Sequence, residues 1–337
     1  MENKKLNFVV IGAGRFARNH IRILQESKDA NLVGITSRTK ESLGKIRGSV
    51  SKNVVLTTDA SKLINNKNVD CVLIVTPPST HFELAKAAIK AGKHVLLEKP
   101  MAANLKEADE LRKIVKNQNK VFMVAHQYIY SDYINYLKSN IKEIGKVSFV
   151  YGEHLYPGPM RNDIGCLWDA GTHVLSIIQY LFSPGSIKNI SGNGADILGN
   201  KLDDFTTCTI EFENGLKALI TVSWLYPEKS RRLIAFGNKS TVFFDDLSND
   251  SKLKFYKVIP KNKQNRSIYS DNFEKMEINP VIKSIDAKDV LKNQLNHFIG
   301  CIKNKKEPET GIEKSYQITE WLDKISREIK LPGYREF

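Results

Sequence analysis

Two polar residues one helical turn apart, Asp169 and His173, lie in a stretch that is otherwise apolar at helical spacing. The spacing of four places both side chains on one face of a helix, at the edge of its apolar stripe. Histidine exchanges a proton near neutral pH, and the carboxylate can orient a substrate or raise the basicity of the imidazole. From these residues alone, a local helix pair with a satisfied core histidine is the better interpretation, and a catalytic pair is the alternative.

Lys99 follows an apolar predicted strand, residues 94–97, at the carboxyl end where open α/β sheets bind ligands. Pro100 restricts Lys99 to extended geometry and so fixes the direction of its side chain. An ammonium group in that place can hydrogen-bond a substrate hydroxyl and stabilise an alkoxide as hydride leaves. A surface lysine paired with Glu98 explains the same residues equally well.

The segment GAGRFA, residues 12–17, joins an apolar stretch to a helix-like stretch. Strand, G-x-G-x-x-A turn and helix together are the sequence pattern of a dinucleotide site. Gly12 permits the tight turn, Gly14 lets the backbone approach a pyrophosphate, and Ala17 leaves room for helix and strand to pack. The helix N-terminus offers free N–H groups to the phosphates. An ordinary glycine-rich turn is the alternative.

The residues that follow the second predicted strand bear on the choice of cofactor. NAD-binding chains carry Asp or Glu about 20 residues past the glycine turn, where it accepts a hydrogen bond from the ribose. This chain has Ser37 and Arg38 there. Serine can hydrogen-bond a 2′-phosphate, and arginine can neutralise it and stack on adenine. The pair favours NADP; a solvated arginine in a loop is the alternative.

The loop before the Asp169 helix holds candidates for substrate binding. Arg161 can bind a carboxylate or a diphosphate, and Trp168 suits a sugar or nicotinamide face but is equally well explained as a core residue. A zinc site formed by Cys166, Asp169 and His173 is less favoured, because no fourth ligand and no helical H-x-x-x-H motif accompany them. We therefore predict no metal site.

Composition limits the classes of protein and partner. The 337 residues suggest about two domains, and 41% hydrophobic with 26% charged residues is ordinary for a soluble protein with a large core. The net charge of +14 is dispersed, and its densest part, 252–266, is interpreted as a solvated edge and loop. We expect no nucleic-acid or membrane partner, whereas a phosphorylated or carboxylated small substrate is compatible with this charge. Four scattered cysteines, and no signal peptide or membrane-length apolar run, indicate a cytoplasmic protein.

Hydrophobic patterns predict the elements that must position these residues. In the first part of the chain strands alternate with helices, which indicates a Rossmann fold with a doubly wound parallel sheet. The predicted strands are 6–11, 30–37, 54–56, 69–75, 94–97 and 121–125.

From residue 146 the pattern changes to strands with alternating side chains, which indicates a mostly antiparallel open sheet with helices on one face. Its predicted strands are 147–154, 205–212, 216–224, 232–236 and 241–245, and its predicted helices are 167–181, 287–304 and 312–330. Glu213-Asn214-Gly215 predicts a hairpin with a primed turn. We predict an NAD(P)-binding domain over 1–125 and a substrate-binding domain over 126–337, with the last helices free to pack back on the first.

Four motifs in sequence, GAGRFA at 12–17, TPPSTH at 76–81, EKP at 98–100 and the D-x-x-x-H helix at 169–173, resemble the Gfo/Idh/MocA oxidoreductases. The likeness covers nearly the whole chain. It implies NAD(P)-dependent hydride transfer between nicotinamide and a hydroxyl or keto carbon of a sugar, cyclitol or nucleotide-linked sugar.

The resemblance also implies roles for individual residues. The catalytic group would be Lys99, Asp169 and His173, and these three would bind substrate together with Arg161 and Trp168. The dinucleotide would be bound by Gly12, Gly14, Arg15, Phe16, Ala17, Ser37, Arg38, Thr76, Pro77, Pro78, His81, Glu98 and Lys99. A homodimer or homotetramer formed through the second sheet is expected.

Two other functions fit the same motifs. Some relatives of this family are glycosidases that use tightly bound NAD for a transient oxidation, so that cofactor redox state is unchanged overall. A non-catalytic sensor that binds dinucleotide is the other alternative, although the joint presence of Lys99, Asp169 and His173 argues against it.

Overall fold

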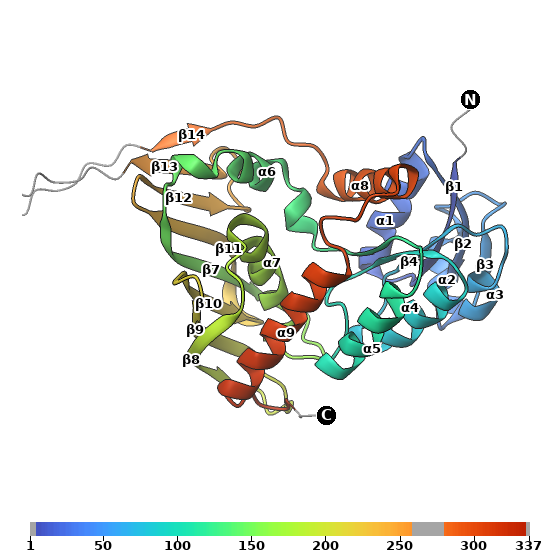
Figure 1. Ribbon diagram of the computed structural model, residues 1–337. Helices are drawn as coiled ribbons and strands as arrows, with labels where there is room; N and C mark the ends of the chain where they lie inside the picture. Colours follow the sequence, from blue (N-terminus) through green and yellow to red (C-terminus); the bar gives the residue numbers. More distant parts are fainter. Residues whose placement is uncertain (1–4, 258–279, 335–337) are drawn as a thin grey trace, which may run out of the picture.

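The computed structural model describes residues 5–257 and 280–334, and these ranges form two β-sheets with helices packed around them (Figure 1). The first sheet has six strands and the second has eight. None of the helices in the described ranges combines the length and the apolar character that a bilayer crossing requires.

The first sheet is a doubly wound parallel sheet, as predicted, with strand order β3-β2-β1-β4-β5-β6. Its strands are β1 (Leu6–Ile11), β2 (Ala30–Thr36), β3 (Val55–Thr57), β4 (Cys71–Ile74), β5 (His94–Leu97) and β6 (Phe122–Val124). The helices in this part of the chain are α1 (Arg15–Glu26), α2 (Lys40–Arg47), α3 (Ala60–Ile64), α4 (His81–Lys90) and α5 (Leu105–Lys116).

Continuous apolar strands explain why this sheet is covered on both faces. All four residues of β4 are buried, for example, as in a central parallel strand. One face packs against α1, α2 and a returning helix, α8 (Val290–Asn304), and the other against α3, α4 and α5. The order reverses between β1 and β4, so a crevice opens at the carboxyl ends of these strands.

The second sheet is mostly antiparallel, with strand order β14-β13-β12-β11-β7-β10-β9-β8. Only β7 and β10 pair in parallel among its described strands. The strands are β7 (Val147–Pro157), β8 (Ile187–Ala195), β9 (Phe205–Phe212), β10 (Lys217–Ser223), β11 (Leu225–Gly237), β12 (Ser240–Asp245), β13 (Leu253–Lys257) and β14 (Val281–Lys283).

Alternating burial gives this sheet one covered face and one open face. In β9 every second residue is buried, and the residues between are half-exposed. The buried face packs against α6 (Asp132–Ser139), α7 (Thr172–Phe182) and α9 (Ile312–Glu328), whereas Figure 1 shows no described helix over the other face. The prediction of helices on one face of an open sheet is confirmed.

Three strands, β8, β13 and β14, were missed and one turn was predicted wrongly. β8 lacks hydrophobic alternation, and its Gly192 is required because a Cβ there would lie 2.3 Å from the Thr207 carbonyl oxygen. β13 occupies part of 252–266, the region predicted as an edge and loop, whose remainder from 258 onward lies outside the described residues. The primed turn at 213–215 is wrong: Gly215 has a φ of +84°, but Asn214 does not share the positive φ that type I′ requires.

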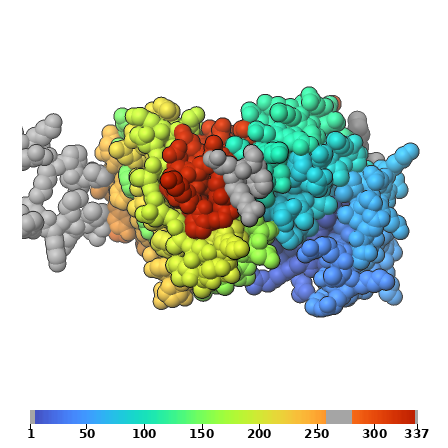
Figure 2. Space-filling view, turned by 90° about the horizontal axis from the view of Figure 1, so that it is seen from below, coloured from blue at the N-terminus to red at the C-terminus, as the bar shows by residue number. Residues whose placement is uncertain are grey.

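The two last helices lie at the junction of the sheets. α8 packs on the first sheet, where the rings of Phe298 and Phe8 lie 6.1 Å apart. α9 contacts both α5 and α7, and Figure 2 shows the end of the chain, in red, between the two halves of the molecule. Because α8 returns to the first sheet, the division of the chain after residue 125 stays a prediction.

Candidate functional site

A large cleft, with a volume of about 1120 Å³, runs from the glycine turn after β1 to the end of β7. It lies at the carboxyl ends of β1, β2, β4, β5 and β6, where an open parallel sheet binds ligands. Of the residues predicted to bind cofactor or substrate, the cleft wall includes Gly12, Gly14, Arg15, Phe16, Ala17, Ser37, Arg38, Thr76, Pro77, Pro78, Glu98, Lys99, Arg161, Asp169 and His173.

The glycine turn fits a dinucleotide on its geometry. Gly12 has a φ of +119°, and a Cβ there would lie 2.0 Å from the Val75 carbonyl oxygen, so this turn accepts only glycine. A Cβ on Gly14, in contrast, would meet no atom within 4 Å. The N-terminus of α1 has neither a side-chain cap nor an acidic residue in its first turn. Its free N–H groups therefore point toward open space that a pyrophosphate can fill.

The wall beside the glycine turn contains the residues predicted to select the cofactor. Ser37 and Arg38 line the cleft directly after β2. Arg38 is exposed, and no ion pair joins it to another described residue. The guanidinium group is thus free to bind an anion at this end of the cleft.

His81, predicted to bind cofactor, does not line the cleft. Its ring is fully buried, with Nδ1 2.8 Å from the Pro100 carbonyl oxygen and Nε2 3.0 Å from the Thr76 carbonyl oxygen. Burial lowers the pKa of His81, so the ring is neutral and donates only one of these two hydrogen bonds at a time. His81 therefore braces two loops of the cleft from behind.

Lys99 projects from the end of β5 and crosses to the second part of the chain. Its Nζ donates to the Asp169 carboxylate at 2.7 Å and to the Asp169 carbonyl oxygen at 2.9 Å. The preceding residue, Glu98, is also buried and lies 2.7 Å from Nε2 of His20 on α1. The Lys99–Pro100 peptide bond is cis. The glycine-turn helix, the β5 loop and the Asp169 segment are thus joined through two polar contacts, of which His20–Glu98 is buried and Lys99–Asp169 is partly buried.

Asp169 accepts hydrogen bonds from several donors at once. Besides Lys99, the Tyr156 hydroxyl donates to it at 2.8 Å and Trp224 Nε1 lies at 3.3 Å. Burial on its own raises the pKa of this carboxyl, but the charge and hydrogen bond of Lys99 outweigh burial and bring the pKa to about 2. Asp169 is therefore ionised throughout the physiological range, and it faces Lys99.

A buried carboxylate that was not predicted fixes the start of the Asp169 helix. This helix begins as a π-helical turn, Leu167–Gly171, and continues as α7. Asp203 accepts from the backbone N–H of Leu167 at 2.8 Å and from the Cys166 thiol at 3.1 Å. Gly165 lets the two segments approach, because a Cβ there would lie 1.6 Å from an Asp203 oxygen. Cys166 thus bonds to this capping carboxylate.

His173 lies in a stack of aromatic rings at the inner end of the cleft. Its ring lies 4.9 Å from the parallel ring of His154, and Tyr128 contacts both rings edge-on. Burial is the largest cause that lowers the pKa of His173 well below its usual value, followed by the charge of Lys99. Burial likewise lowers the pKa of His154 and of His126 to about 3. All three rings are therefore neutral, and His173 can accept a proton.

The two remaining predicted substrate residues lie in different places. Arg161 lines the cleft, where its Nε donates to Asp163 at 2.9 Å, and Asp163 in turn accepts from the Ser79 backbone at 3.4 Å. Trp168 is only 4% exposed and donates through Nε1 to Ser326 in α9 at 3.0 Å. The structure therefore places Trp168 in the core, away from the cleft.

Several cleft residues were not singled out from the sequence. Gln127 and Tyr128 follow β6, and His154 and Tyr156 lie near the end of β7. The rule that pointed to Lys99, a polar side chain after a predicted strand, would have found Gln127 and Tyr128. Arg231 lies in a charged run that has no strand-like alternation, so the sequence carries no comparable signal for it.

Comparisons with known proteins agree with this architecture. Residues 6–126 match a family model described as an oxidoreductase family with an NAD-binding Rossmann fold, and residues 140–243 match the Gfo/Idh/MocA C-terminal domain. The chain is 27% identical over 241 residues to UDP-N-acetylglucosamine 3-dehydrogenase of Acidithiobacillus ferrooxidans, which covers 71% of this chain and 74% of that protein. The solved structure of that enzyme superposes with a TM-score of 0.82 at 21% identity, covering 97% and 98% of the two chains.

Other relatives carry different names. Myo-inositol 2-dehydrogenase of Thermotoga maritima is 24% identical over 258 residues, 71% of this chain and 75% of the relative. Glucose-6-phosphate 3-dehydrogenase of Bacillus subtilis is 34% identical over 192 residues, 51% of this chain and 53% of the relative.

Proposed function

The chain belongs to the Gfo/Idh/MocA family of oxidoreductases with an NAD-binding Rossmann fold, and we propose that it transfers hydride between NAD(P) and a carbinol or keto carbon of a sugar, cyclitol or nucleotide-linked sugar. The relatives named above act on such compounds by their names, some neutral and some carrying phosphate. The observation that supports catalysis most directly is the meeting of Lys99, Asp169 and His173 in the cleft that holds the glycine turn.

Three side chains divide the work of the reaction in this proposal. Bound nicotinamide supplies the hydride acceptor for oxidation and the donor for reduction. During oxidation His173, which is neutral, accepts the proton of the substrate hydroxyl. Lys99 stabilises the negative charge that develops on the same oxygen. Asp169 accepts a hydrogen bond from the ammonium group of Lys99 and so fixes the position of that group.

We also propose that NADP is the preferred cofactor. Arg38 and Ser37 line the end of the cleft that receives the ribose, and Arg38 forms no ion pair with another described residue. The chain has no carboxylate at these two positions to repel a 2′-phosphate.

A net change in the redox state of the cofactor distinguishes the proposed function from its alternatives. Purified protein is mixed with NADP⁺ or NAD⁺ and a panel of sugars, cyclitols and nucleotide sugars, while the absorbance of reduced nicotinamide is followed. A dehydrogenase forms reduced cofactor in proportion to product. Hydrolysis of a glycoside without net reduced cofactor would instead establish the glycosidase, and dinucleotide binding without either reaction would establish the sensor.

Finally, we propose a cytoplasmic homo-oligomer that forms through the open face of the second sheet. That face carries half-exposed apolar side chains in neighbouring strands, and Phe236 on β11 is 42% exposed. Light scattering of the purified protein gives its mass in solution. Phe236→Asp should reduce that mass to one chain, and a monomeric unaltered protein would contradict this proposal.

A further inference from the structure

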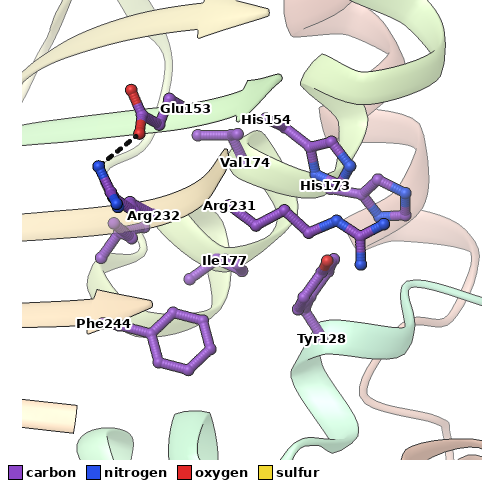
Figure 3. A pocket seen from close by; sticks show the side chains of 10 residues that line it. Tyr128, Glu153, His154, His173, Val174, Ile177, Arg231, Arg232 and Phe244 are labelled. Atoms are coloured by element: carbon purple, nitrogen blue, oxygen red, sulfur yellow. Dashed lines mark ion pairs between the residues drawn. The ribbon is translucent and has the colours of Figure 1, made fainter. Parts of the chain in front are cut away.

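The inner end of the cleft has more cationic than acidic side chains. Lys229 and Arg231, both in β11, line the cleft there. Lys229 lies where β11 departs from regular pairing with β7, and both side chains line the same cleft. Arg231 also pairs in register with His154 on β7, which places it beside the His154 and His173 rings. Figure 3 shows the Arg231 guanidinium pointing toward these rings and Tyr128, whereas Arg232 points to Glu153.

Nearby carboxylates neutralise this charge only in part. Asp169 is already paired with Lys99, and Asp163 is paired with Arg161. Asp246 lies 3.5 Å from Arg231 and also 3.5 Å from Lys252, so one carboxylate faces two cations at long distance. Lys229 is exposed and forms no ion pair within the described part of the chain.

Arg231 is also incompletely hydrogen-bonded. Its Nε is buried and has no hydrogen-bond partner among the described residues. A buried donor without a partner costs stability, and a guanidinium group binds phosphate or carboxylate through two parallel N–H bonds. A ligand that supplied such an oxygen would satisfy Nε and neutralise the surplus charge together.

We infer that the substrate carries an anionic group, a phosphate, diphosphate or carboxylate, which Arg231 and Lys229 bind next to His173. This inference rests on the proposed function, because it concerns the substrate of the same cleft. It goes further by excluding neutral sugars and cyclitols as the preferred substrates. Arg231 and Lys229 are thus specificity-determining residues, distinct from the groups that handle hydride and proton.

The test is binding of matched sugars to the protein loaded with NADP⁺, measured by titration calorimetry, followed by hydride transfer with the same compounds. The pairs are glucose with glucose 6-phosphate, glucose with glucuronic acid, and N-acetylglucosamine with UDP-N-acetylglucosamine, which also distinguish phosphate ester, carboxylate and diphosphate. At least one anionic member should bind on the order of tenfold to a hundredfold more tightly than its neutral partner, as charge-assisted hydrogen bonds to two cations allow.

Two variants locate the effect. Lys229→Met, which alters an exposed side chain, and Arg231→Met should each abolish most of that preference, because each removes one of the two cations that bind the anion. Lys217→Met removes an exposed charge from β10 outside the cleft and serves as the matched control. Thermal melting checks that each variant is folded.

The outcomes separate the inference from the proposed function. Absence of binding by every anionic compound, equal binding of the pairs, or a preference that survives in both variants would overturn the inference. Turnover of a neutral sugar in preference to the anionic ones would also overturn it while supporting the proposed function. Tight, variant-sensitive anion binding without hydride transfer to any compound would support the inference and contradict the proposed function.

Discussion

The two ends of the cleft are built in different ways. At the glycine-turn end, the wall is formed by the loops after β1, β2 and β4, in which Phe16 and Arg38 are exposed and Gly14 faces open space. At the inner end, the wall consists of charged and aromatic side chains from the β5 loop, β7, the π-helical turn and α7, and the Lys99–Asp169 ion pair joins two of these segments. A substitution at the glycine-turn end should therefore alter ligand binding without altering the stability of the fold, whereas a substitution at the inner end should alter both.

Gly14→Val tests this comparison with the largest expected effect. The added side chain enters the space where the pyrophosphate would lie, and it meets no protein atom within 4 Å of its Cβ. We expect dinucleotide binding to be lost and the free energy of unfolding to change little. Fluorescence titration with NADPH and urea unfolding measure the two quantities. Unchanged affinity in the folded variant would disprove the assignment of the glycine turn.

His173→Ala should lower kcat by about 10²- to 10⁴-fold, the usual contribution of a positioned proton-transfer group. Dinucleotide affinity should stay nearly unchanged, because His173 lies at the inner end of the cleft. Steady-state kinetics with the best substrate and NADPH titration check both parts. A variant that retains kcat within a few fold would rule out His173 as the base.

Lys99→Met should destabilise the fold as well as slow the reaction. Asp169 would remain buried without its cation, and breaking a buried ion pair in this way costs about 3–5 kcal/mol. The side chains of the pair are 17% and 11% exposed, so solvent screening is limited. Urea unfolding measures the loss, and Lys99→Met with Asp169→Leu should recover much of it. If the single variant loses less than about 1 kcal/mol, the pair is not coupled to the fold.

Arg38→Ala should act at the glycine-turn end and on binding alone. Loss of a charge-assisted hydrogen bond should weaken NADP binding by about 1.5–3 kcal/mol and leave NAD binding nearly unchanged. Comparison of the two dissociation constants tests this directly, with Arg18→Ala as a control on the neighbouring helix. Equal losses for both cofactors would mean that Arg38 does not contact the 2′-phosphate.

Lowering the pH should reduce the stability of the fold through its buried histidines, and the expected loss for each pH unit is the smallest of the predicted effects. The pKa values of His126 and His154 are lowered by burial from 6.5 to about 3, so unfolding takes up protons as pH falls below 6.5. The stability present above pH 6.5 is therefore lost progressively on the way to pH 3, by at most about 1.4 kcal/mol per pH unit for each histidine. Thermal melting from pH 7.5 to 5 measures this loss. His126→Gln should reduce the slope, and an unchanged slope would contradict it.

How much of this could be predicted from the sequence differs between the two ends as well. The first sheet was predictable because strands buried on both faces are continuously apolar, and the glycine turn follows directly in the chain. Asp169 and His173 could be placed on one helical face, but the contact of Asp169 with Lys99 depends on packing between segments 70 residues apart. The sequence alone did not decide whether Lys99 would pair with Glu98 or with Asp169.

Other inner-end residues could not be predicted for the same reason. Arg231 lies beside His154 only because β11 pairs with β7 in that register, which the charged run around 228–232 does not specify. Trp168 was compatible with both a substrate contact and a core position, and its hydrogen bond to Ser326 on α9 decides in favour of the core. The role of Asp203 could not be predicted from the sequence, because it accepts a hydrogen bond from the π-helical turn only when its own loop folds back against that turn.

The return of α8 to the first sheet has a consequence for synthesis of the chain. Phe8 in the first strand packs against Phe298, and the face of the sheet around it is covered partly by α8. At ribosomal rates of about 5–20 residues per second, the nascent chain waits roughly 15 to 60 s between these two residues. Throughout that interval the first sheet carries a bare apolar strip. The apolar face of the first sheet is therefore fully covered only when the last sixth of the chain has been synthesised. A chain truncated before α8 would expose this face to solvent and would aggregate more readily.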